Sequence, residues 1–442
     1  MTFSAGTVIR SYFGSRGGEL EVGSMPIGAV IATVGTPVFV YDEAVLEKKW
    51  RLLRDAYPPA FQVCYSVKAN PNPHLIRFFL RQGCGLEIAS AGEFHASESA
   101  GCAPERMLFA GPGKTEQELE LVLGRGIGEI HVESETEVGR IAAICRRLGV
   151  RGRVAVRVNP SEAAQGGAMQ MGGKSAPFGV DEEQLGALVD RILEDRALEF
   201  QGLHLFVGTQ ILDASILMRQ YRKGVEIASS VARRAAVPIR TLDFGGGLGI
   251  PYFDGEDELD MAGLRRELDA LVGDVRRDGA LEGTRFIVEP GRYLVGEAGV
   301  YVTRVTDVKV SRGKKYLVMD GGMNHHLAAS GNLGRVIRRN FPVGLINRIA
   351  DETLEPVDVV GPLCTPLDVL ARDVALPSPR VGDLLGVFQS GAYARAASPL
   401  GFLSHPTPPE VLVGGGKVTL IRRRGTHQDW LQDVPPMTGN GP

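Results

Sequence analysis

The sequence predicts an α/β protein built from a (β/α)8 barrel followed by a C-terminal all-β domain. From Phe61 to Arg292, a short apolar run, a turn and a helical period repeat eight times. The repeats cover about 230 residues, roughly 29 per unit, which is the usual size of a barrel unit. After Gly299 the alternation stops, and β-branched runs separated by glycine and proline follow. A doubly wound sheet also alternates strands and helices, but eight evenly spaced units favour the closed barrel.

Each barrel strand is expected where an apolar or β-branched run precedes a turn. These runs are residues 63–69, 86–90, 107–111, 129–133, 153–159, 200–206, 241–245 and 285–291. Ser134, followed three residues later by Glu137, forms a capping-box pattern that predicts a helix start. A second helix is expected within residues 181–195. The predicted buried faces of the two helices consist of Val138, Ile141, Cys145 and Leu148, and of Leu185, Leu188, Val189 and Ile192.

The same patterns divide the chain into four parts: residues 1–42 as strands that join the β domain, 43–295 as the barrel, 296–434 as the β domain and 435–442 as a disordered tail. The β-domain strands are expected at residues 301–310, 316–320, 356–361, 384–389 and 411–421. Residues 25–41 are interpreted as two further strands. Residues 166–177 are rich in glycine and are expected to form a lid or an inserted loop.

Composition excludes several classes of protein. The chain has 442 residues, of which 44% are hydrophobic and 23% charged, as in ordinary globular proteins. A net charge of −3 favours neither nucleic acid nor an anionic membrane as a partner. Proline and glycine interrupt the longest apolar stretch, and the N-terminus lacks a signal-peptide pattern. The five cysteines are odd in number and lack a Cys-x-x-Cys pair. We therefore expect a cytoplasmic enzyme without a metal.

Three features that could take part in catalysis or binding lie at the carboxyl ends of predicted barrel strands, where barrel enzymes carry their active sites. They comprise Lys68, the run Gly245, Gly246 and Gly247, and the pair Glu289 and Arg292. Glycines let backbone N–H groups approach a phosphate, and an arginine adds a charged partner. A lysine can form a Schiff base, and a carboxylate can pair with a pyridinium nitrogen. Together these groups predict a site for pyridoxal phosphate. A Rossmann dinucleotide site is disfavoured because the third glycine of its motif is Ile250 here.

The chain resembles the fold-type III pyridoxal-phosphate decarboxylases, the group that contains diaminopimelate and ornithine decarboxylases. The resemblance extends from Thr36 to Val413 and rests on six ordered motifs. They are Tyr65-Ser-Val-Lys68-Ala-Asn, Gly208-Thr209-Gln, Asp243-Phe-Gly-Gly-Gly, Glu289-Pro-Gly-Arg292, Gly361-Pro-Leu-Cys364 and Gly391-Ala-Tyr393. It implies an alanine-racemase-like barrel, a Schiff base on Lys68, and phosphate contacts from the glycines, Arg292, Thr209 and Tyr393. It also implies a homodimer in which Cys364 completes the partner's site.

The carboxylate at position 289 indicates the reaction type. A carboxylate keeps the pyridine nitrogen protonated, so that the ring is a strong acceptor for the electrons left after CO2 departs. Related racemases have an arginine at this position, so decarboxylation is favoured over racemisation. Cys364, or a neighbouring acid, would then return a proton to the α-carbon.

The departures from the family concern the substrate. Where diaminopimelate decarboxylases have a glutamate after the cysteine, this chain has Thr365, although Asp368 is kept. Phe206 replaces the histidine that the family stacks on the cofactor, and whether it or His204 takes that role is left open. His405 stands in the segment that replaces the family's Tyr-Asn-x-Arg-Pro, and His325 in an altered Gly-Met-Asn segment. The candidate substrate-binding residues are therefore Thr365, Asp368, His325 and His405.

These changes resemble a divergent subgroup associated with natural products or exopolysaccharides, in which some members act on an amino acid joined to an acyl carrier protein. We therefore expect a glutamyl or aspartyl group on such a carrier as substrate. Alternatives are diaminopimelate, another free amino acid or siderophore precursor, and a catalytically silent regulatory homologue. A basic run could bind an acidic carrier protein or be only a solvated helix face; it consists of Arg335, Arg338, Arg339 and Arg348.

Overall fold

The computed structural model describes residues 4–161, 169–170, 175–206, 208–331, 339–349 and 354–436. Most of the glycine-rich segment 166–177 and residues 437–442 of the expected tail lie outside these ranges. The chain forms two compact units, one of Lys48–Pro251 with Asp257–Leu294, the other of Met1–Glu47, Tyr252–Glu256 and Val295–Pro442. Tyr252–Glu256 thus belongs to the second unit although it lies inside the expected barrel range.

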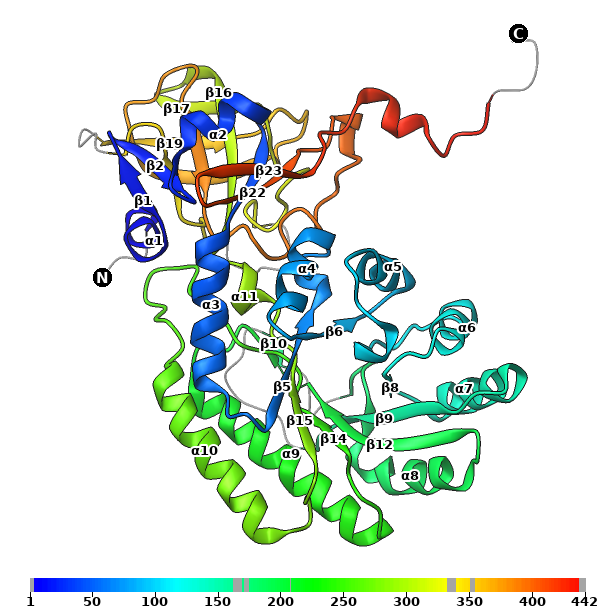
Figure 1. The fold of residues 1–442 in the computed structure, drawn as a ribbon. Coiled ribbons are helices and arrows are strands. Elements are labelled where there is room, and N and C mark those ends of the chain that lie inside the picture. The colour runs from blue at the N-terminus through cyan, green and yellow to red at the C-terminus, as the bar shows by residue number, and fades with distance from the viewer. Residues whose placement is uncertain are drawn as a thin grey trace. The chain divides into compact units, whose positions relative to one another are not determined.

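The first unit is a closed barrel of eight parallel strands, which confirms the predicted fold class (Figure 1). The strands are β5 (Phe61–Ser66), β6 (Gly85–Ile88), β7 (Met107–Phe109), β8 (Glu129–Val132), β9 (Gly152–Asn159), β12 (Leu198–Leu205), β14 (Thr241–Asp243) and β15 (Arg285–Val288). They pair in chain order, and β15 closes the ring on β5. All eight predicted runs form strands, and six of these strands are shorter than expected because the last residues of the run belong to the loop that follows.

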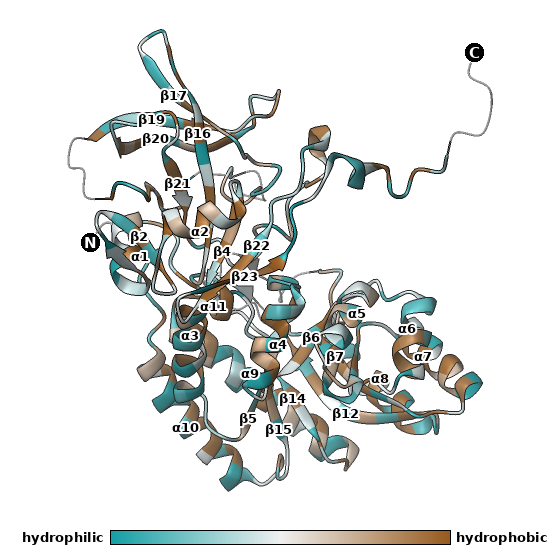
Figure 2. Ribbon diagram, turned by 45° about the horizontal axis from the view of Figure 1, so that its top comes forward, coloured by the Kyte–Doolittle hydropathy of each residue, from teal (hydrophilic) through white to brown (hydrophobic). Residues whose placement is uncertain are grey.

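Helices alternate with these strands along the chain and carry both hydrophilic and hydrophobic residues (Figure 2). They are α3 (Glu43–Ala56, which begins in the second unit), α4 (Pro73–Arg81), α5 (Ala91–Ser99), α6 (Glu116–Gly124), α7 (Glu135–Leu148), α8 (Leu185–Glu194), α9 (Ala214–Ala235), α10 (Met261–Asp278) and the short α11 (Arg292–Val295). Among the described residues, every helix is too short or too polar to span a bilayer.

The predicted cap at the start of α7 is present in part. The Ser134 side chain accepts from the Glu137 N–H, as expected. The Glu137 carboxylate, however, accepts from the Glu133 N–H and from Lys114 Nζ, at 2.7 Å each. A reciprocal capping box occurs instead at the start of α6, between Thr115 and Glu118. The sequence pattern therefore located the helix start correctly, while the tertiary neighbours of Glu137 took its second bond.

The second unit contains a mixed sheet whose path is β20-β19-β17-β16-β4-β22-β23, with β21 paired to β16 and β18 to β21. The strands are β4 (Val38–Asp42), β16 (Gly299–Ser311), β17 (Lys314–Met319), β18 (Val343–Leu345), β19 (Leu354–Val360), β20 (Val369–Pro377), β21 (Leu384–Val387), β22 (Glu410–Gly414) and β23 (Lys417–Arg422). An N-terminal strand, β4, lies between β16 and β22, so the start of the chain joins this sheet. Its core includes Val38, Val40, Val300, Val302 and Val411.

The interpretation of residues 25–41 as two strands is wrong for their central part. This segment forms the short strand β3 (Met25–Pro26), the helix α2 (Ile27–Val34) and then β4. The N-terminal part also contains α1 (Ala5–Tyr12) and a small sheet with β1 (Gly14–Arg16) and β2 (Glu19–Val22). Ile27, Val30 and Ile31 are buried at the i, i+3, i+4 spacing of a helix. The β-branched residues of this segment predicted a strand. The segment forms a helix because the helix buries one apolar face.

Candidate active site

The barrel unit encloses a cavity of about 390 Å³, a size typical of small-molecule sites. It is lined by Lys68, Glu87, Ala89, Ala110, Gly111, Pro112, Gly113, Lys114, Glu118, Arg157, Phe178, His204, Phe206 and Glu289. Many of these residues follow or end barrel strands, at the carboxyl edge where barrel enzymes carry their chemistry. The cavity therefore unites Lys68 and Glu289, which lie far apart in the sequence.

Lys68 was predicted at the end of a strand, but it lies two residues beyond the strand end. β5 ends at Ser66, and Lys68 occupies the short 3-10 turn Val67–Ala69 that follows. Its Nζ contacts both carboxylate oxygens of Glu87, at 2.8 and 2.7 Å, and Ser66 Oγ donates to the same carboxylate at 2.6 Å. This ion pair favours the ammonium form of Lys68. The amine must lose a proton before it attacks a carbonyl, and Glu87 is within reach to accept it.

The loop that carries Glu289 packs directly on the lysine turn. The Ser66 N–H donates to the Pro290 carbonyl at 3.2 Å. A Cβ at Gly291 would lie 2.8 Å from Ala69 Cβ, so a larger residue would push the two loops apart. Glycine at 291 therefore allows Glu289 and Lys68 to line the same small cavity.

The glycine run after β14 forms a turn that only glycine permits. Gly245 and Gly247 have φ values of +65° and +96°. A Cβ on Gly246 would lie 2.5 Å from the Glu289 carbonyl oxygen, and one on Gly247 would lie 3.1 Å from the Gly208 carbonyl oxygen. Gly208 and Thr209 form strand β13, so the Thr209 segment borders this turn. Such an open backbone loop suits a phosphate.

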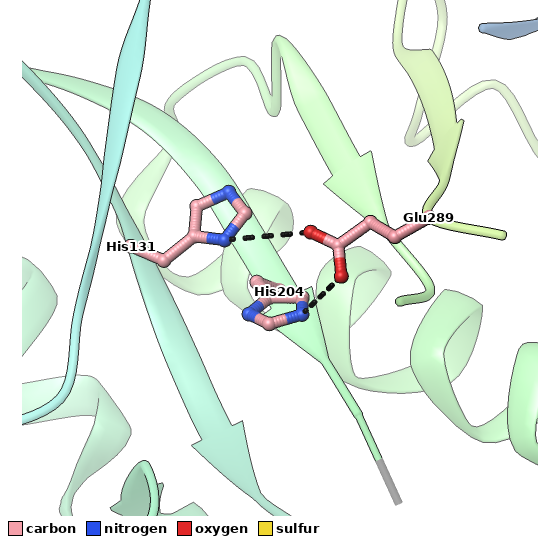
Figure 3. Close-up of side chains that lie close together, drawn as sticks. All are labelled: His131, His204 and Glu289. Carbon is pink, nitrogen blue, oxygen red and sulfur yellow. Dashed lines mark ion pairs between the residues drawn. The ribbon is translucent and has the colours of Figure 1, made fainter. Parts of the chain in front are cut away.

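Glu289 lies in a buried group of titratable side chains (Figure 3). His204 Nε2 is 3.6 Å from Glu289 Oε2, and His131 Nδ1 is 4.0 Å from Glu289 Oε1. The two imidazole rings stack with their centroids 4.3 Å apart. Burial lowers the pKa of His204 to about 4, so this ring is neutral at physiological pH.

Glu289 and Asp243 are two buried acids that interact, and they differ in which of them carries a proton. Burial, together with the charge of Glu289, raises the pKa of Asp243 well above its usual value. Burial acts in the same direction on Glu289, but His204, Lys68 and His131 outweigh it and lower the pKa of Glu289. Asp243 therefore holds the proton and Glu289 is the carboxylate, the form required to face a pyridinium nitrogen.

The donor atoms of His131, His204 and Glu289 lie within 4.8 Å of one another, close enough to raise the question of a metal ion. The ring geometry argues against a shared ion. Imidazole lone pairs lie in the ring plane, and the two stacked rings are inclined by only 30°. Their lone pairs therefore do not converge on one point, and we assign no metal to this group.

His204 and Phe206 occupy different parts of the site. The contacts of His204 are with Glu289 and His131, as described above. The ring of Phe206 lies against the glycine turn, where a Cβ on Gly245 would come within 2.8 Å of its Cδ2. The Arg157 guanidinium lies 5.9 Å from the centre of this ring.

Several polar residues around the cavity were not predicted from the sequence. Glu133 accepts from Arg157 at 2.9 Å and from the N–H groups of Gly111 and Gly179 at 2.8 and 2.9 Å. Buried Lys114 donates to two carbonyls and to Glu137. A signal was available: strands buried on both faces should be apolar throughout, yet charged residues interrupt these runs. The interruptions are Glu87, Glu129, His131, Arg157 and His204.

Arg292, the first residue of α11, is the last candidate in the barrel unit. The other candidates lie in the second unit. Cys364 is exposed, and Thr365 is half-buried beside it. Both oxygens of buried Asp368 accept backbone N–H groups, from Met323 at 2.7 Å and from Leu363 at 2.8 Å. These bonds tie the cysteine loop to the segment after β17, so Asp368 is engaged in holding the loop and not in a free ionic contact.

The two histidines predicted to contact substrate lie near each other. His325 is buried, its Nδ1 is 3.1 Å from the Tyr301 hydroxyl, and burial together with His405 lowers its pKa to about 3. His325 is therefore neutral.

Tyr393 is half-buried and has a φ of +54°, a backbone conformation that tyrosine rarely adopts.

The basic run predicted to meet a carrier protein is only partly described. Arg335 and Arg338 lie outside the described residues. Arg339 lies 5.5 Å from the centre of the Phe253 ring, and Arg348 pairs with Asp383 at 2.5 Å. The two described arginines therefore have partners within this chain.

Glu93 gives the barrel a pH-dependent stability. Burial, with the nearby charge of Glu87, raises the pKa of Glu93 from 4.5 to about 7. The folded state therefore binds a proton that the unfolded chain releases, and stability falls as pH rises from 4.5 toward 7. Relative to a Glu93→Gln variant, we expect wild type to lose about 2 kcal/mol of unfolding free energy across this window. Denaturant melts at several pH values check this, and parallel curves for the two proteins would contradict it.

Comparisons with known proteins agree with this geometry. A family model described as "Pyridoxal-dependent decarboxylase, pyridoxal binding domain" matches residues 43–296. The L-glutamyl-[BtrI acyl-carrier protein] decarboxylase of Niallia circulans is 39% identical over 91% of this chain and 94% of its own length. The diaminopimelate decarboxylase of Aquifex aeolicus is 34% identical over 93% and 95%, respectively.

Solved structures give the same result. The diaminopimelate decarboxylase of M. jannaschii in complex with L-lysine superposes with a TM-score of 0.88 at 25% identity, covering 96% of this chain and 98% of that one. The matched family region contains Lys68, the glycine turn and Glu289, the residues that line or border the barrel cavity. The chain therefore belongs to the pyridoxal-dependent decarboxylases and is a carboxy-lyase that uses pyridoxal phosphate.

Proposed function

We propose that this decarboxylase removes the carboxyl group of an acidic aminoacyl unit, glutamyl or aspartyl, that is tethered to an acyl carrier protein in natural-product biosynthesis. The observation that carries the proposal is the lack of a free carboxylate among the four predicted substrate residues. Thr365 is uncharged, and Asp368 is occupied by two backbone donors. The Niallia circulans relative, whose name specifies an L-glutamyl carrier-protein substrate, supports it.

The barrel residues fit pyridoxal phosphate. The open glycine turn would hold its phosphate with Arg292, and Thr209 would add a contact. The buried Glu289 carboxylate, whose Oε1 has no hydrogen-bond partner among the described residues, would serve the ring nitrogen, and Lys68 would hold the aldehyde carbon. Phe206, which lies against the glycine turn, is the better candidate for stacking on the ring, because His204 is engaged with Glu289.

When bound, pyridoxal phosphate supplies the acceptor for the electron pair left as CO2 departs. The chain's own residues manage the protons. Glu87 accepts the proton that Lys68 loses on becoming a nucleophile, since both its oxygens contact Nζ. Glu289 stays ionised because Asp243 holds the shared proton. Cys364, from the partner subunit's copy of its loop, returns a proton to the α-carbon.

Substrate preference tests the proposal. A cationic distal group without a partner in a closed site weakens transition-state binding by about 3 kcal/mol. Diaminopimelate should therefore be turned over roughly two orders of magnitude less efficiently than the true substrate. The measurement is kcat/KM for diaminopimelate, free glutamate, and glutamyl- and aspartyl-loaded carrier protein on one preparation. Efficient turnover of diaminopimelate would overturn the argument from the missing acid. Equal values for free and loaded glutamate would eliminate the carrier.

We further propose a homodimer with shared active sites. Cys364 is exposed in the single chain, as expected of a residue that serves a neighbouring site. Mixing an inactive Lys68→Ala protein with an inactive Cys364→Ala protein should then restore up to about a quarter of wild-type activity, assuming random two-fold pairing. No recovery despite confirmed subunit exchange would mean that each site is built from one chain.

A further inference from the structure

His131 lies beneath the cavity, and the proposed function leaves it without a role. Its side chain is fully buried on β8, and its carbonyl accepts from Lys114 Nζ at 2.7 Å, which fixes the backbone there. The ring lies near three carboxyl groups, and its Nε2 is 3.9 Å from Asp243 Oδ2. Nε2 lies 3.1 Å from Glu129 Oε1, and Nδ1 lies 4.0 Å from Glu289 Oε1. His131 therefore connects the cofactor's predicted partner to a deeper acid.

Glu129 fixes the position of the ring. Thr241 Oγ1 donates to Glu129 Oε2 at 2.9 Å, and Glu129 Oε1 forms a hydrogen bond of 3.1 Å with His131 Nε2. Both oxygens of Glu129 are therefore satisfied, and this residue anchors the ring.

The second nitrogen, Nδ1, lies on the side of the ring toward Glu289. Among the described residues, neither His131 Nδ1 nor Glu289 Oε1 has a hydrogen-bond partner, although both are buried. The two atoms lie 4.0 Å apart, and His131 is one of the groups that lower the pKa of Glu289. Nδ1 is therefore the atom through which the ring acts on Glu289.

We propose that His131, anchored by Glu129, is a positioning residue that holds the Glu289 carboxylate in place for the cofactor's ring nitrogen. The inference rests on the proposed role of Glu289. The charged and titratable groups around Glu289 come from several elements: Glu129 and His131 on β8, His204 on β12, Asp243 on β14, Lys68 after β5, with Glu87 on β6 paired to Lys68 and Arg157 on β9 acting on His204.

Three substitutions distinguish the roles of the two ring nitrogens of His131. His131→Asn places an amide nitrogen near the position of Nδ1, toward Glu289, and His131→Gln places one near Nε2, toward Glu129. His131→Phe keeps the ring and removes both nitrogens. His95→Gln is the matched control, because His95 is exposed on α5 and its ring lies 3.5 Å from the Glu98 carboxylate.

The primary measurement is the dissociation constant of pyridoxal phosphate for cofactor-free protein as a function of pH, alongside thermal unfolding. Because His131 acts to lower the pKa of Glu289, its removal should raise that pKa, and His131→Phe should bind about 30-fold more weakly at neutral pH. The acid limb of its binding curve should move to higher pH. His131→Asn should stay within about fivefold of wild type, His131→Gln should resemble the phenylalanine variant, and His95→Gln should match wild type.

Equal affinities and equal pH curves for the three His131 variants, whatever their thermal stability, would show that His131 only packs and would overturn the inference. The measurement needs no substrate, so failure of the carrier-tethered substrate leaves it standing. Wild-type protein that binds no cofactor would remove this inference together with the proposed function.

Discussion

Lys68→Ala should lower kcat by at least about three orders of magnitude, equivalent to more than about 4 kcal/mol of barrier, while the protein keeps its fold. The variant removes the amine that would hold the cofactor. The Lys68 side chain is 44% exposed, so water screens its pair with Glu87. Glu87 is 1% exposed but keeps its bond from Ser66, so we expect about 2 kcal/mol of lost stability. Reduction with borohydride should label Lys68 in wild type and nothing in the variant.

Lys114 is a matched control, since it lines the same cavity but is only 1% exposed at its side chain. Its ammonium group binds two carbonyls and Glu137, so Lys114→Ala leaves a buried carboxylate without its partner. The unfolding free energy should fall by about 3 kcal/mol, without loss of the borohydride label on Lys68. Label found on Lys114 in wild type would contradict the assignment of Lys68.

Glu289→Gln should reduce kcat by about two to three orders of magnitude, since one charged hydrogen-bond partner in a dry site is lost. The amide has no charge with which to stabilise a protonated ring nitrogen. Glu289→Asp, which keeps the charge on a shorter side chain, should lie between the glutamine variant and wild type. Steady-state kinetics at saturating cofactor measure both. A glutamine variant as active as wild type would remove the proposed role of Glu289.

The barrel could be predicted because each strand is a buried apolar run with a clear turn after it, and eight such units recur at one spacing. The helix α2 could not, because its β-branched residues favour a strand locally, while burial against the rest of the unit selects the helix. Strands such as β20 (Val369–Pro377), which has several exposed residues, lack an apolar alternation that would have revealed them.

The site divides in the same way. Lys68, the glycine turn and Glu289 were predictable because each belongs to a compact motif at a strand end. The group beneath Glu289 was not, because its members come from separate strands; Glu129 and Thr241, for instance, are 112 residues apart. Only the closed barrel brings them together. The ion pair of Lys68 with Glu87 and the backbone bonds of Asp368 likewise depend on contacts between distant segments.

We propose that this site decarboxylates an acidic aminoacyl group on a carrier protein. Mass spectrometry of glutamyl-loaded carrier protein, before and after incubation with the enzyme and pyridoxal phosphate, measures this reaction itself. We expect the carrier's acyl arm to lose the mass of one CO2 with wild type and to keep it with Lys68→Ala. An unchanged arm, in a preparation that releases CO2 from a free amino acid, would contradict the claim.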